Sequence, residues 1–514
     1  MSPAPDLVVR HTGGVEATGR PPEPVRLIEV LGALALATDL GMGQPLGHAI
    51  RCALIADGLA GQLGLDPAAR ADVVQVGLLR YLGCTADAAE VAVYAGDEIA
   101  LAVAVAPHVM GDPDQERRAV GGADPAAAKA AALRAHCEAA GLLAARLELR
   151  PAVVTALRHG FERWDGTGHP AGLAGEAVPL PTRIAILARD AEVWSRRGGY
   201  AAAAETVRSR RGKAYDPTVA DAFCAAGEPL LRRAGEAGWA DLLDTEPVPA
   251  VVPADRFDAL LDVLADFADA KLPYALGQSR TVARLVQAAA AEAGVDQAAR
   301  TRLRRAALVH DLGRVGISNR VWDRQGPLTL ADLEKVRLHP YLSEQVLTRS
   351  APLRPLAGLA GAHHERLDGS GYYRGVGAGQ LGADQQLLAA ADAYAAMRQA
   401  RPHRHALTAA AACAELTAEA GKGRLAPQAV AAVLAAGTDT PLAPVRWPNG
   451  LTDREVEVLR LACRGATRQA VADQLGVSAK TVSRHLENSY AKIGVSTRAA
   501  AALFAVAHGL LDPP

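Results

Sequence analysis

The sequence has few aromatic residues, no closely spaced cysteine pairs and almost no net charge. Phe, Trp and Tyr make up 4% of the 514 residues, whereas 50% are hydrophobic. A chain with so few rings and so much alanine favours closely packed helices over sheets, so we predict an all-α fold. Because the net charge is −1, any contact with nucleic acid must come from a local basic patch.

The cysteines and the apolar runs exclude further classes of protein. The six cysteines are scattered without a CxxC pair, which argues against a structural zinc and for a reducing compartment. The first residues lack an apolar signal segment, and no run of about 18 apolar residues occurs elsewhere. The prediction is a cytoplasmic protein with no membrane contact.

A chain of this length predicts about three domains. Pro-rich stretches at 245–254 and 437–449 are typical of linkers, and residues 1–24 have the Pro, Gly and charge content of a disordered tail. We therefore predict domains at 25–244, 255–436 and 450–514.

The second domain concentrates side chains that bind metals. The segments AALVHDLGRVGI, VRLHPYLSEQVL, AGAHHERLDGSGYY and LLAAADAYAAM follow one another. Their imidazoles and carboxylates are a mixed N/O set, which suits Fe, Mn or Zn better than Ca or Mg. A carboxylate beside a histidine can bridge two metals. The candidate ligands are His310, Asp311, His339, His363, His364 and Asp392.

This order of motifs resembles the HD-GYP branch of the HD phosphohydrolases from about Arg256 to Ala436. The resemblance implies a helical bundle, a divalent metal pair on these six residues, and hydrolysis of cyclic di-GMP or another phosphate ester. It places Asp311 and Arg314 at catalytic positions and favours Fe or Mn over Zn.

Three positions depart from the family pattern. Gln278 replaces the first ligand histidine, Arg314 replaces a lysine, and Tyr373 replaces the proline of Gly-Tyr-Pro. An amide oxygen is a weaker ligand than imidazole, and Arg is not interchangeable with Lys as a point charge. We expect a metal site that is mostly intact, and whether it is catalytic stays open.

The N-terminal half repeats this pattern without its chemistry. Residues 26–84 align without gaps to residues 256–314, and FERWDGTGHPAGLAG resembles HERLDGSGYYRGVGAG. A cation at the bridging position repels metal, so we predict a degenerate copy that packs, dimerises or binds a small ligand. The residues opposite the six ligands and Gln278 are Arg80 and Tyr81 for His310 and Asp311, Gly160 and Phe161 for His363 and His364, His136 for His339, Asp190 for Asp392, and His48 for Gln278.

The last domain carries the signals of four short helices. Thr452 and Glu455 predict a capping box, Gly476 a helix end, and Ser478 and Thr497 further N-caps. The second and third helices, joined by a turn with a buried Val477, predict a helix-turn-helix.

This segment resembles the LuxR-type DNA-binding domain over its full length. The resemblance implies that residues 479–493 form a recognition helix in the major groove of double-stranded DNA. Palindromic sites would require a homodimer. The predicted DNA-binding residues are Thr467, Arg468, Lys480, Thr481, Arg484, His485, Asn488 and Lys492.

The predicted architecture is thus all-α, with two HD-type helical bundles and a C-terminal four-helix LuxR-type domain. Three functions remain open. The first is a transcription regulator whose HD copies sense a ligand such as a cyclic dinucleotide. The second is a metal-dependent phosphodiesterase with a DNA-binding output domain. The third is an adaptor in which the HD copies only dimerise.

Overall fold

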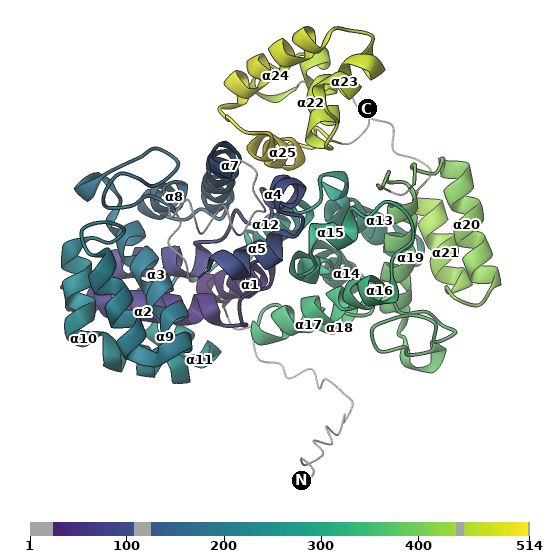
Figure 1. Cartoon of the computed structure of the whole chain (residues 1–514). Helices are drawn as coiled ribbons and strands as arrows, with labels where there is room; N and C mark the ends of the chain where they lie inside the picture. The colour runs from purple at the N-terminus through teal and green to yellow at the C-terminus, as the bar shows by residue number, and fades with distance from the viewer. Residues whose placement is uncertain (1–23, 107–124, 403, 438–446, 512–514) are drawn as a thin grey trace.

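The computed structural model describes residues 24–106, 125–402, 404–437 and 447–511. The predicted tail, up to residue 23, and most of the linker at 437–449 lie outside these ranges. The described residues form helices with short connections and no β-strand, which confirms the all-α prediction (Figure 1).

The first copy of the repeat is built from ten α-helices among its described residues. They are α1 (Leu27–Gly41), α2 (His48–Gln62), α3 (Pro67–Leu79), α4 (Ala88–Ala95), α5 (Glu98–Val105), α7 (Pro125–Arg146), α8 (Pro151–Arg158), α9 (Leu180–Arg210), α10 (Pro217–Glu236) and α11 (Trp239–Thr245), with a 3-10 turn η1 (Gly175–Ala177).

The second copy follows the same order of elements. It contains α12 (Phe257–Asp269), η2 (Pro273–Ala275), α13 (Gln278–Glu292), α14 (Gln297–Val309), η3 (Leu312–Gly316), α15 (Asn319–Trp322), α16 (Leu330–Arg337), α17 (His339–Arg349), α18 (Arg354–Ala360), η4 (Ala378–Gln380), α19 (Ala383–Met397), α20 (Ala409–Gly421) and α21 (Pro427–Ala436).

One apolar core runs through both copies, because the first helix of each packs on the other. Helix α1 packs on η3 and α17 of the second copy, and α12 packs on α7 of the first. A buried ion pair of 2.8 Å between Lys271 and Glu98 adds a polar contact between the copies. The copies therefore form one body.

A glycine in each copy lets the end of one helix approach another closely. A Cβ atom on Gly313 would lie 2.2 Å from the carbonyl oxygen of His339, and one on Gly83 would lie 2.1 Å from that of His136. No real side chain fits at such distances. The glycine therefore fixes the turn after α14 against the start of α17, which places three of the candidate ligands near one another.

The C-terminal domain rests on the two copies, and its apolar core includes Leu276 of the second copy (Figure 1). Its elements are η5 (Pro448–Gly450), α22 (Asp453–Cys463), α23 (Arg468–Leu475), α24 (Ala479–Ile493) and α25 (Arg498–Ala507). The capping box of Thr452 and Glu455 and the N-caps at Ser478 and Thr497 form as predicted. Val477 is only partly buried against this core.

Helix α25 is the side of this domain that meets the HD copies, where it packs on α7 and α12. The carboxylate of Glu138 accepts hydrogen bonds of 2.6 Å from the Ser496 backbone and the Thr497 hydroxyl. Arg498 pairs with Glu90 at 3.0 Å. These contacts leave α24 on the outer side (Figure 1).

No helix in the described ranges combines the length and the apolar character that crossing a membrane requires. The cytoplasmic location stays a prediction.

Candidate metal centre and DNA-binding surface

The six candidate ligands come from four separate elements of the second copy and converge in its interior. His310 and Asp311 lie between α14 and η3, and His339 begins α17. The pair His363 and His364 follows α18, and Asp392 lies in α19. All are buried except His364, whose side chain is 20% exposed. The structure thus brings together the residues that the sequence predicts.

Three of the histidines are held in the tautomer that binds metals through Nε2. The Nδ1 atoms of His310, His339 and His363 lie 2.6–2.7 Å from the backbone carbonyl three residues earlier. Because a carbonyl oxygen only accepts, each Nδ1 carries the proton. A neutral ring then presents the Nε2 lone pair to the interior, which is how ligating histidines are usually oriented.

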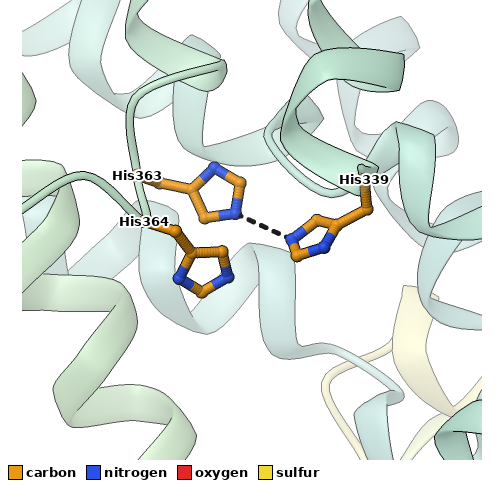
Figure 2. Close-up of side chains that lie close together, drawn as sticks. All are labelled: His339, His363 and His364. Carbon is orange, nitrogen blue, oxygen red and sulfur yellow. Dashed lines mark hydrogen bonds between the residues drawn. The ribbon is translucent and has the colours of Figure 1, made fainter. Parts of the chain in front are cut away.

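The carboxylate of Asp311 lies between these three Nε2 atoms. Its Oδ2 is 3.1 Å from His310, and its Oδ1 is 3.4 Å from His339 and 3.6 Å from His363. The Nε2 atoms of His339 and His363 are 3.2 Å apart, and Figure 2 shows these rings meeting with His364 beside them. Two ligands bound at right angles about 2.1 Å from one metal are about 3 Å apart, so this spacing fits shared metal ions.

Asp392 extends the centre on its other side. Its Oδ1 is 3.5 Å from His310 Nε2, and its Oδ2 is 3.9 Å from His364 Nδ1. The side-chain amide of Gln278 donates to the same Oδ1 at 3.4 Å. The residue that replaces the family's first ligand therefore still faces the centre.

The protonation states of two of these histidines, His339 and His363, favour metal binding. Burial lowers the pKa of His339 to about 3 and that of His363 to about 4, so both rings are neutral near pH 7. Burial would lower the pKa of His310 as well, but Asp311 and Asp392 raise it to about 10. A positive charge, whether a proton or a metal, is thus favoured between His310 and the two carboxylates.

Several atoms of the centre lack a partner, which tests whether a metal pair fits. Among the described residues, His310 Nε2, Asp311 Oδ1 and Gln278 Oε1 are buried without a hydrogen bond. Buried polar atoms normally have a partner. These atoms are all metal-ligand types, so the residues present fit divalent cations. Arg314 contacts Asp311 Oδ2, the oxygen that also faces His310, and its guanidinium lies over the Trp322 ring.

Sequence reasoning missed the residues that support this centre. The Ser343 hydroxyl donates to the His310 carbonyl at 2.6 Å and accepts from the Gly313 N–H at 2.8 Å. The Tyr373 hydroxyl, at the position of the family's proline, donates to Glu344 at 2.7 Å. In the sequence, a serine one turn after His339 was the only sign of the contact that Ser343 makes.

The same place in the first copy holds cations in place of ligands. Helices α8 and α18, turns η1 and η4, and helices α9 and α19 all begin at matching positions. This register places Arg189, and not Asp190, opposite Asp392, so the alignment from sequence was wrong by one residue. Matching the two aspartates directly introduced a one-residue shift that the preceding loop does not contain.

Three other residues of the first copy that could bind a metal contact one another at a different place. His48 pairs with Glu192 at 2.6 Å, and Cys52 lies beside it, so three metal-type donors lie within 4.8 Å. Arg51 and Arg196 already hold the Glu192 carboxylate. This cluster is a charge-neutralised ion-pair network.

The predicted DNA-binding residues of the recognition helix lie on one exposed side of the C-terminal domain. Predicted residues 479–493 are the helix α24, capped by Ser478. Lys480, Arg484 and Asn488 are exposed at successive turns, with Thr481 and His485 half-buried beside them. Lys480 and Arg484 have no ion-pair partner among the described residues. This exposed side of α24 thus presents the two cationic side chains and the amide of Asn488.

The other three predicted residues have different surroundings. Thr467 caps α23 by accepting from the Ala470 N–H at 3.1 Å, and Arg468 is exposed beside it. Lys492 donates to Glu455 at 2.7 Å, so its charge is largely used within the domain.

Comparison with family models assigns both parts of the chain. The model described as HD domain matches residues 124–219 and 262–428, just over half of the chain. The chain belongs to the HD domain family. The model described as bacterial regulatory proteins, luxR family, matches residues 449–505, so the chain also carries a LuxR-type DNA-binding domain.

Relatives of the HD copies have described activities. A 3'3'-cGAMP-specific phosphodiesterase 3 of Vibrio cholerae is 29% identical over 408 residues, which cover 74% of this chain and 88% of the relative. A cyclic di-GMP phosphodiesterase of Thermotoga maritima is 34% identical over 135 residues, 26% of this chain and 37% of the relative.

A solved structure has the same fold. The crystal structure of a cyclic GMP-AMP-specific phosphodiesterase of V. cholerae superposes with a TM-score of 0.57 at 25% identity. It covers 81% of this chain and 99% of its own.

Proposed function

We propose that this protein is a DNA-binding transcription regulator whose second HD copy binds a divalent metal pair and a cyclic dinucleotide. The observation that carries the proposal is the orientation of the LuxR-type domain. It docks through α25, while Lys480 and Arg484 on α24 face outward. DNA could therefore be read while the domain remains on the HD copies.

Electrophoretic mobility shifts with the full chain test the DNA contact. Lys480→Ala should lower affinity for all sequences and reduce the slope of log affinity against log salt by about 1. Arg484→Ala should cost about 1–3 kcal/mol if it reads a guanine. Lys335→Ala, an exposed lysine on α16, is the matched control. Unchanged binding in the Lys480→Ala, Arg484→Ala double variant would contradict the proposal.

A second function, hydrolysis of the cyclic dinucleotide, is supported by a separate observation. The three Nε2-directed histidines around Asp311 are arranged as ligands, and the V. cholerae relative is a cGAMP-specific phosphodiesterase. Bound divalent ions would supply Lewis acidity toward a phosphodiester. The chain's own part is to fix the ring tautomers, to bury the centre and to hold Arg314 against the Asp311 carboxylate.

Turnover of 3'3'-cGAMP and cyclic di-GMP tests this function. Protein purified without oxygen and supplied with Mn or Fe should hydrolyse at least one of them, and Asp311→Ala should abolish hydrolysis. If neither substrate is turned over, a binding measurement with the same two nucleotides decides between a sensor and a scaffold.

The homodimer also remains a proposal, motivated by the two-fold symmetry of typical half-sites. Light scattering of the full chain, with and without palindromic DNA, measures it. A monomer in both states would rule out the adaptor function.

A further inference from the structure

The first HD copy contains a cavity at the position that the metal centre has in the second. Its volume is about 90 Å³. It is lined by Arg80, Tyr81 and Phe161, which stand where the second copy has His310, Asp311 and His364, and by Arg189, which stands where it has Asp392. Roughly three water volumes fit in such a space, which is the scale of one phosphate group.

The lining contains more cationic than acidic residues. It contains two acidic residues, Glu162 and Asp190, and both are already used. Glu162 accepts backbone hydrogen bonds from Ala171 and Leu173, at 2.6 and 2.9 Å. Asp190 accepts from the Tyr215 hydroxyl and from two of the arginines. The cationic lining residues are Arg80, Lys129, Arg163, Arg189 and Arg210. Of these, Arg163 pairs with Asp165, outside the lining, at 3.0 Å.

Arg80 is the residue that points to an anion. Its side chain is 9% exposed, and its Nη1 donates to the Gly160 carbonyl. Its guanidinium carbon lies 4.9 Å from the Phe161 ring centre. Its Nε has no partner among the described residues. A buried cation that no carboxylate of the cavity neutralises is costly unless an anion joins it.

Arg189 lies on the other wall of the cavity, where its charge is paired with Asp190. Its Nη1 donates to Asp190 at 2.7 Å and to the Ala106 carbonyl at 2.6 Å. Within the part of the chain that the structure describes, its Nε is buried without a hydrogen bond. Two positions that carry ligands in the second copy thus carry guanidinium groups here.

We propose that this cavity is a metal-free binding site for a phosphate group, carried by a nucleotide or another phosphate ester. Guanidinium groups match phosphate oxygens with paired hydrogen bonds and supply fixed positive charge where the second copy would hold metal ions. Because Tyr81 replaces Asp311 and neither ligand histidine of the pair at 363–364 is present, the site binds its ligand and leaves it intact.

The site also shares a helix with the DNA-binding domain. Helix α7 contributes Lys129 and Leu133 to the cavity. Its Glu138 holds the start of α25 through Ser496 and Thr497. Lys129 and Glu138 are nine residues apart, about 14 Å along the helix. This placement gives a phosphate ligand a position next to the docking contact of the DNA-binding domain.

Titration with inorganic phosphate, followed by 31P NMR at constant ionic strength, tests the proposal. The full chain should carry Asp311→Ala and be kept in EDTA, so that the second copy contributes neither metal nor its central carboxylate. Saturable phosphate binding is expected. Arg80→Met in this background should weaken it at least about tenfold, and Arg80→Lys should restore part of it because the charge returns.

Two further variants keep the test decisive. Arg302→Met, which removes an exposed arginine from α14 of the second copy, should leave phosphate binding unchanged. Lys129→Ala, on the half-buried edge of the cavity, should weaken binding even if Arg80→Met fails to fold. The proposal is overturned if the parent chain shows no saturable binding, or if every foldable first-copy variant binds phosphate as tightly as the parent. Because every arm lacks Asp311, these outcomes do not depend on hydrolysis by the second copy.

Discussion

The two HD copies agree in their scaffold down to single hydrogen bonds and differ at their centres. In the loop after the position of the paired histidines, Glu162 accepts from the backbone of Ala171 and Leu173. Glu365 accepts from the equivalent residues, Arg374 and Val376, at 2.8 and 3.0 Å. The loop is thus built in the same way whether or not histidines precede it.

The centres show what this scaffold tolerates. In the second copy, His310 Nε2 and Asp311 Oδ1, two atoms that could bind a metal, are buried without a hydrogen bond. This arrangement fits bound cations. In the first copy, Arg80 and Arg189 bring the positive charge on side chains, which fits a bound anion. The comparison teaches that backbone contacts hold the fold, so the charge at the centre can change sign without loss of the bundle.

Removal of the central carboxylate should have the largest effect and should separate the copies most clearly. Asp311→Asn is expected to lower metal affinity at least about 100-fold, because it neutralises the group that faces three Nε2 atoms. Metal content per chain, measured after dialysis, checks this. Tyr81→Phe at the equivalent position of the first copy is the matched control and should not change metal content. Equal losses in both variants would contradict the division of roles.

The shared glycines should break both copies to a similar degree. Gly313→Ala and Gly83→Ala each force a methyl group against a backbone carbonyl, so we expect a loss of about 1–3 kcal/mol in the free energy of unfolding. Urea denaturation followed by circular dichroism measures it. Gly313→Ala should also reduce metal content, whereas Gly83→Ala should leave it intact if folded. A neutral Gly83→Ala would show that the first copy has relaxed its scaffold as well as its chemistry.

Restoring the missing ligand should have the smallest effect. Gln278→His places an imidazole beside Asp392, and we expect metal affinity to rise about tenfold, or 1.4 kcal/mol. Competition with a chelating dye measures this affinity. The reciprocal change in the first copy, His48→Gln, should not alter metal content, because His48 pairs with Glu192 there. A weaker site in Gln278→His would mean that Gln278 is itself a fitted ligand.

Much of the fold could be predicted because its signals are local. The range of the recognition helix and the caps at Thr452, Ser478 and Thr497 follow from short-range hydrogen bonds, and the structure confirms them. The register of α9 was mispredicted because the two aspartates were matched directly, although extending the match of Phe161 with His364 without a gap places Arg189 opposite Asp392. The Lys271–Glu98 pair could not be predicted either, because its two residues are far apart in sequence and charged residues are usually expected at the surface.

The sequence by itself determined the all-α class, the repeat, the six candidate ligands and the LuxR-type domain, because residue type and spacing carry these features along the chain. Only the tertiary structure decided that the six ligands converge and that three histidines present Nε2. It also decided that α7 runs from the cationic cavity to the DNA-binding domain. These features depend on how distant helices pack, and packing energy is shared among contacts that no single segment contains.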